Sequence, residues 1–134
     1  QDLFFDLLKE RAETGRIYIM NLDHCNSHSS FKDKVSMSNL CQEITLPTTP
    51  IQDIHDEQGE IALCILSAVN VGGLNDLSEL ENICDLSVRA LEQIIDYQDY
   101  PVKAAEVSTK KRRSLGVGYI GLAHYLAKHG VGYS

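Results

Sequence analysis

One stretch decides the fold: Glu60-Ile61-Ala62-Leu63-Cys64-Ile65-Leu66-Ser67-Ala68-Val69-Asn70-Val71. Its centre is apolar without polar alternation, and it lies between Gly59 and the pair Gly72-Gly73. A continuous apolar run bounded by glycines is typical of a strand that is covered on both faces, as in parallel sheets. We therefore expect a buried strand over 60–71.

A long helix should follow this strand. Ser78 and Glu81 have the spacing of a capping box, and Pro101 must end the helix. Apolar positions line one face of it: Leu77, Leu80, Cys84, Val88, Leu91 and Ile95. A second glycine-rich apolar segment at 115–126 completes a βαβ-like order, which predicts an α/β protein. A further helix should open over Leu122–Lys128.

The first part of the chain is less regular. Leu3, Phe4, Leu7 and Leu8 have helical spacing before a stop at Gly15, and residues 16–22 are β-branched and aromatic, which predicts a strand. Residues 23–58 form a long irregular excursion, and such excursions are usually functional or disordered. Because the chain begins and ends inside expected elements, we expect it to be a segment of a larger protein.

Composition excludes several classes. The chain has 134 residues, a net charge of −7 and a pI of about 5.1, whereas nucleic-acid-binding domains normally carry a positive excess. The apolar runs are shorter than the ~18–20 residues that cross a bilayer, and the first residues lack the basic start of a signal peptide. We expect a cytoplasmic protein with neither nucleic acid nor membrane as a partner.

Two local patterns point to sites that we reject. Gly116-Val117-Gly118-Tyr119-Ile120-Gly121 matches a dinucleotide-binding pattern, but a basic run precedes it and the last acidic residue is Glu106. These glycines are better explained by close backbone packing, and the basic run by a solvated face. His24, Cys25 and His28 offer zinc ligands, but a structural zinc site normally needs four, so we expect no metal.

The most informative stretch for chemistry is 38–48. If it is locally extended, Asn39, Cys41 and Glu43 project to one side, because side chains alternate along a strand. An amide, a thiol and a carboxyl would then face a common space. The alternative interpretation, a polar loop edge whose cysteine points inward, explains the same residues, and the sequence pattern does not decide between the two.

Five motifs resemble the large, catalytic subunit of class I ribonucleotide reductase. They are Arg16-Ile17-Tyr18-Ile19 with Asp23-His24-Cys25-Asn26; Ser38-Asn39-Leu40-Cys41 with Glu43; Gly59-Glu60-Ile61-Ala62-Leu63-Cys64; Asp96-Tyr97-Gln98-Asp99-Tyr100-Pro101; and Arg112-Arg113-Ser114-Leu115-Gly116-Val117-Gly118. They follow the family's order and span essentially the whole chain.

The resemblance implies a fold. Residues 1–134 would be part of a catalytic α/β barrel of ten strands, with residues 23–58 as the finger loop in its centre. Cys41 would become a thiyl radical that abstracts the 3′-hydrogen of a ribonucleotide. Glu43 would accept the 3′-hydroxyl proton, and Asn39 would hydrogen-bond the sugar, with Ser38 and Leu40 also at the substrate.

The resemblance also implies partners. Cys64 would be one of two cysteines that supply reducing electrons, its partner lying before residue 1. The reaction would convert ribonucleoside diphosphates to deoxyribonucleoside diphosphates. The radical would come from a metal-containing small subunit and the electrons from thioredoxin or glutaredoxin, so this segment would bind no cofactor and be inactive without the remaining large-subunit sequence. The alternative is a non-catalytic structural or assembly fragment of a split subunit.

Overall fold

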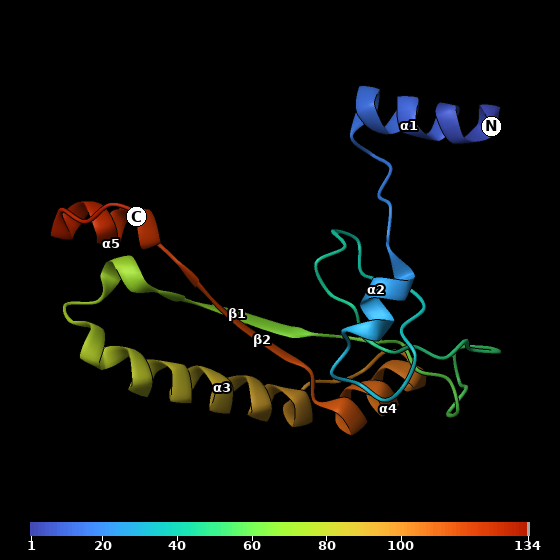
Figure 1. Ribbon diagram of the computed structural model, residues 1–134. Coiled ribbons are helices and arrows are strands. Elements are labelled where there is room, and N and C mark those ends of the chain that lie inside the picture. Colours follow the sequence, from blue (N-terminus) through green and yellow to red (C-terminus); the bar gives the residue numbers. More distant parts are fainter. Residues whose placement is uncertain (134) are drawn as a thin grey trace. The chain divides into compact units, whose positions relative to one another are not determined.

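The computed structural model describes residues 1–133, which form two compact units, residues 1–48 and residues 49–133 (Figure 1). The first unit contains helices α1 (Asp2–Thr14) and α2 (Leu22–Ser27). The predicted stop of α1 is confirmed, since Gly15 follows it with a φ of 64°, a left-handed conformation that glycine adopts without strain.

The strand predicted over 16–22 is wrong. Residues 16–21 form neither helix nor strand, and α2 begins at Leu22. β-branched and aromatic residues favour a strand through packing against neighbouring strands, and no strand pairs with 16–21 in the described part of the chain. Composition alone therefore misled the prediction.

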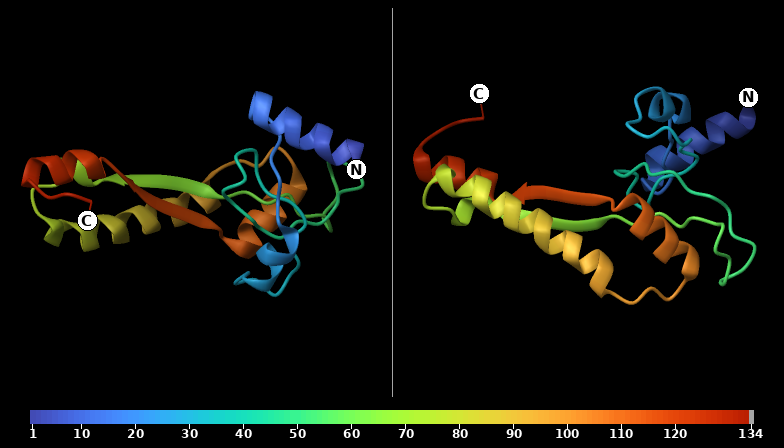
Figure 2. Two further views of the ribbon diagram at one scale, coloured as in Figure 1. Left: turned by 45° about the horizontal axis from the view of Figure 1, so that its top comes forward. Right: turned by 90° about the horizontal axis from the view of Figure 1, so that it is seen from below.

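The second unit is α/β. Strands β1 (Ile65–Asn70) and β2 (Leu115–Ile120) pair in parallel, with Ile65 opposite Leu115 and Asn70 opposite Ile120. Helices α3 (Leu80–Tyr97) and α4 (Lys103–Arg112) connect them, and α5 (Leu122–His129) follows β2. Two short 3₁₀ turns, Val71–Gly73 and Leu77–Glu79, lead from β1 into α3. Figure 2 shows α3 running alongside the two strands.

Two expectations for this unit need correction, and one helix was not expected. The ladder begins at Ile65, so the strand is shorter than 60–71. The capping box joins Asp76 to Glu79 instead of Ser78 to Glu81, because the chain first makes a 3₁₀ turn and caps that. Helix α4 was not expected; its apolar residues show no helical stripe, and the basic run forms its last turn. The helix predicted over Leu122–Lys128 is confirmed as α5.

The core of the second unit lies between the sheet and α3. Val69, Val71 and Leu74 are its buried centre, and Val117 and Cys84 pack against it. Cys84 is thus half-buried against the core, on the packed side of α3, in line with its place on the predicted helix stripe. Along β1 the residues alternate between this packed side and an exposed side, so α3 covers one face of the sheet.

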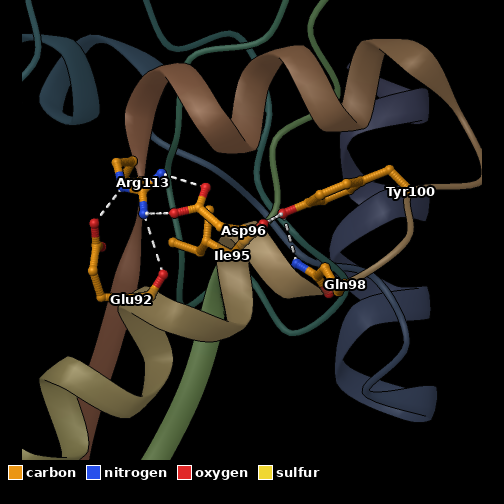
Figure 3. A network of polar contacts seen from close by, with 6 residues as sticks. All are labelled: Glu92, Ile95, Asp96, Gln98, Tyr100 and Arg113. Atoms are coloured by element: carbon orange, nitrogen blue, oxygen red, sulfur yellow. Dashed lines mark hydrogen bonds and ion pairs between the residues drawn. The ribbon is translucent and has the colours of Figure 1, made fainter.

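The motif at 96–101 ends α3. The Tyr100 hydroxyl donates a hydrogen bond to the Ile95 carbonyl (2.7 Å) and accepts one from Gln98 Nε2 (2.7 Å), as Figure 3 shows. Carbonyls in the last turn of a helix lack partners within the helix, so the hydroxyl satisfies one of them. This part of the motif therefore has a structural role.

Replacing Tyr100 by Phe should weaken the last turn of α3 by about 1–2 kcal/mol, since two partly buried hydrogen bonds of the hydroxyl are lost, one to the Ile95 carbonyl and one from Gln98. Amide hydrogen exchange at residues 94–98 in the complete protein measures this. Tyr97→Phe is the matched control, because that side chain is 90% exposed. Equal exchange in the two variants would contradict the assignment.

Candidate functional site

A tight turn presents the candidate cysteine of the first unit. The Gln42 N–H donates to the Asn39 carbonyl (3.1 Å), which closes a four-residue turn with Leu40 and Cys41 at its apex. Gln42 itself has a φ of 62°. Both apex residues are exposed, Leu40 by 89%, so the turn holds the thiol outward from its own unit.

Asn39 holds this turn with its side chain. Its Oδ1 accepts the N–H of Ile44 (3.0 Å), and its own N–H donates to the Ile44 carbonyl (3.4 Å). The side-chain oxygen therefore serves the turn, and the amide nitrogen is the group that the turn does not use. Glu43, between the two hydrogen-bonded ends, is exposed. Ser38 is half-buried, and its hydroxyl donates to the Asn39 carbonyl (3.4 Å).

The expected extended geometry is wrong at this point. Asn39, Cys41 and Glu43 do not alternate along a strand, because Asn39 and Gln42 close a turn and Gln42 is left-handed. An asparagine that accepts a backbone N–H a few residues on is a turn signal, which the sequence contained. Asn39, Leu40 and Cys41 are therefore the first three residues of a four-residue turn.

Two contacts hold the base of this loop. The hydroxyls of Ser36 and Thr48 lie 3.3 Å apart, in hydrogen-bonding distance, on its two arms. The side chain of Asn26 in α2 binds both backbone groups of Val35. Its Nδ2 donates to the Val35 carbonyl and its Oδ1 accepts the Val35 N–H, at 2.8 Å each, and Val35 is fully buried. Asn26, in the first motif, therefore fixes the arm of the loop that contains Val35.

Cys64, in the second unit, lies one residue before β1. The Ile65 N–H donates to the Ser114 carbonyl (3.1 Å), which starts the pairing with the second strand. On the other side, the Ile61 N–H donates to the Ala104 carbonyl (3.2 Å) in α4. Cys64 is half-buried between these two anchors and is not in a disulfide.

Glu60 adds a third anchor to this segment. Its carboxylate is bound by Lys111 Nζ (2.6 Å) and Arg112 Nε (2.7 Å) at the end of α4, and only 8% of its side chain is exposed. Burial alone would raise the pKa of Glu60, but the hydrogen bonds from the two cations outweigh it and lower the pKa. Glu60 is thus held as a carboxylate close to Cys64 in sequence.

Arg113 joins α3 to the start of β2. Its two terminal nitrogens bind both carboxylate oxygens of Asp96 (3.0 and 2.8 Å), and its Nε binds Glu92, as Figure 3 shows. The hydrogen bond from Arg113 lowers the pKa of Asp96, and the two carboxylates raise the pKa of Arg113. The basic run is therefore paired with carboxylates instead of being only a solvated face.

Sequence reasoning missed these ion pairs because the partners are far apart in the chain. Glu60 lies about fifty residues before the cations that bind it. The signal that was available is the acidic pair at 92 and 96, one helical turn apart, followed by a compact basic run.

Potential metal ligands do not cluster in the described residues. Among residues 1–133, no three His, Cys, Asp or Glu side chains are grouped so that they could hold a metal ion, and His24 and His28 contact each other edge to face with ring centroids 6.5 Å apart. Within the same residues, the helices are too short or too polar to span a bilayer.

Comparison with known proteins agrees with the motifs. Residues 1–134 match a family described as ribonucleotide reductase, barrel domain. The ribonucleoside-diphosphate reductase subunits alpha of Haemophilus influenzae and of Buchnera aphidicola from Schizaphis graminum are 59% and 57% identical over 99% of the chain. The Escherichia coli ribonucleoside-diphosphate reductase 1 subunit alpha is 56% identical over the same share. The chain spans 18% of the length of each of these relatives.

Proposed function

We propose, because the chain belongs to the ribonucleotide reductase family, that it is a catalytic barrel segment of a class I alpha subunit that reduces ribonucleoside diphosphates. Strands β1 and β2 would be two of ten strands, residues 1–134 part of the barrel domain, and residues 23–58 its finger loop. The observation that carries the proposal is the closed turn at 39–42, which presents an exposed thiol at a loop apex within a chain of this family.

In this proposal Cys41 carries the thiyl radical and abstracts the 3′-hydrogen of the substrate ribose. Glu43, exposed two residues on, takes the 3′-hydroxyl proton, a general-base role that needs hydrogen-bond reach of about 2.6–3.2 Å. Asn39 donates to a sugar hydroxyl with the amide nitrogen that the turn does not use. Ser38 and Leu40 complete the contacts with the substrate.

Cys64 supplies reducing electrons together with a second cysteine of the longer subunit. Both S–H bonds break and one S–S bond forms, while the C2′–O bond of the substrate breaks and a C–H bond replaces it. The 2′-oxygen leaves as water, so two electrons and two protons balance. A thioredoxin-type or glutaredoxin-type reductant restores the dithiol, and a metal-containing small subunit supplies the radical.

The test compares two cysteines of the second unit in the complete alpha subunit assembled with its small subunit. Cys64→Ala should lower steady-state deoxynucleotide formation on the order of 10³-fold or more, as removal of other essential catalytic groups does. Cys84→Ala should leave the rate close to that of the parent, because Cys84 packs in the core. Turnover of Cys64→Ala at the parent rate would refute the proposed role.

A further inference from the structure

The environment of the Cys64 sulfur points to a residue outside the proposed catalytic set. Cys64, Leu66 and Gly116 lie on the sheet face opposite α3, since Leu66 alternates with the packed residues of β1 and is 60% exposed. Gly116 is the register partner of Leu66 in β2. Side chains of register partners project to the same face of a sheet, so these residues are neighbours.

The space that a side chain at position 116 would need is occupied by another side chain. A Cβ built on it would lie 2.5 Å from Leu66 Cδ2 and 3.5 Å from Cys64 Sγ. Its φ is not positive, so its backbone conformation is open to any residue. The Leu66 side chain therefore occupies the volume that a side chain at position 116 would take, beside the cysteine sulfur.

We propose that Gly116 is a positioning residue for the Cys64 thiol, because it gives Leu66 a place to lie against β2 and so keeps the sulfur accessible to its redox partner. This inference rests on the proposed function. A methyl group at position 116 must displace the end of Leu66, which is flexible and exposed. On the same face, Leu66 can then turn toward Cys64 or toward Ala68, its neighbours two residues away.

A displaced Leu66 side chain would affect the disulfide chemistry of Cys64. In thiol–disulfide exchange a thiolate attacks a disulfide sulfur and the other sulfur leaves as a thiolate, so the rate at which the proposed Cys64 disulfide is reduced again depends on access to its sulfur. The geometry is also narrow, with Cα atoms about 4.4–6.8 Å apart and S–S near 2.05 Å. An isobutyl group beside Cys64 would obstruct this approach without removing any group that holds the substrate.

The test uses the complete alpha subunit with Gly116→Ala, and Gly118→Ala as the matched control. Gly118 lies on the same strand and face, but a Cβ there would meet nothing within 4 Å. The first measurement is the rate of iodoacetamide alkylation at Cys64, read by peptide mass spectrometry. We expect a decrease of about tenfold in Gly116→Ala and parent behaviour in Gly118→Ala.

A second measurement separates positioning from a general loss of structure. In the assembled enzyme, Gly116→Ala should lower kcat and leave the KM for the nucleotide unchanged. The double variant Leu66→Ala/Gly116→Ala should recover both the alkylation rate and kcat, because the displaced group is gone. Unchanged alkylation in Gly116→Ala, or no recovery in the double variant, would overturn the proposal.

The alkylation measurement does not depend on catalysis. If Cys64→Ala remained active while Gly116→Ala still slowed alkylation, the proposed function of Cys64 would fail and the local packing effect would stand. If Cys64→Ala were inactive and alkylation in Gly116→Ala were unchanged, only the role of Gly116 would fail. The two failures are therefore distinguishable.

Discussion

Cys41→Ser in the complete alpha subunit, assembled with its small subunit, should abolish deoxynucleotide formation. A serine hydroxyl keeps the shape of the turn apex, but its O–H bond is much stronger than a thiol S–H bond, so it cannot exchange a hydrogen atom reversibly with the ribose C–H. We expect a decrease on the order of 10³-fold or more, at the limit set by parent contamination. Product formation from a labelled ribonucleoside diphosphate measures it.

Cys25→Ser is the matched control, because Cys25 lies in the same unit and is half-buried in α2. It should retain activity. The binding of substrate should survive in Cys41→Ser, since Asn39 still closes the turn and the side chains around the apex are unchanged. Full activity of Cys41→Ser would instead favour a segment whose role is structural or assembly-related.

Glu60→Gln should loosen the segment that carries Cys64 by about 3 kcal/mol. Removal of one partner from a buried ion pair costs about 3–5 kcal/mol, and the lower end applies because Lys111 is largely exposed and stays hydrated. Arg112, of which 11% of the side chain is exposed, loses its ion pair with this carboxylate. Amide hydrogen exchange of residues 59–65 in the complete subunit measures the local opening free energy.

Glu106→Gln is the control for that experiment. Glu106 also binds two lysines, Lys103 (3.1 Å) and Lys110 (2.8 Å), but both belong to its own helix, α4. Exchange at residues 59–65 should match the parent in this variant. Similar exchange in Glu60→Gln and Glu106→Gln would show that Glu60 does not anchor the segment.

The same carboxylate predicts a pH dependence. Because the pKa of Glu60 is lowered in the folded protein from its ordinary value of 4.5, its contribution is fully present above that value. The contribution is lost as the pH falls through the lower, folded pKa. Opening of residues 59–65, corrected for intrinsic exchange, should therefore increase in acid in the parent and change less in Glu60→Gln.

Local patterns predicted several elements well. The helix that ends at Gly15, the helix that ends before Pro101 and the parallel strand containing Ile65 each follow from periodicity and breakers in a short window. Helix α4 was missed because its buried residues, Ala104 and Ala105 with Ser108 and Thr109, are too small and polar to produce an apolar stripe. Tertiary packing buries them without a strong local signal.

In the candidate site too, some features could be predicted from the sequence and others could not. The sequence by itself identified the thiol, carboxyl and amide at 39–43 as the candidate catalytic groups, because they lie in a motif that resembles one of the ribonucleotide reductase family. Only the tertiary structure decided that Glu60 is buried against Lys111 and Arg112, and that Gly116 makes room for Leu66. Periodicity reports local conformation, whereas these contacts join residues whose side chains meet only after the chain has folded.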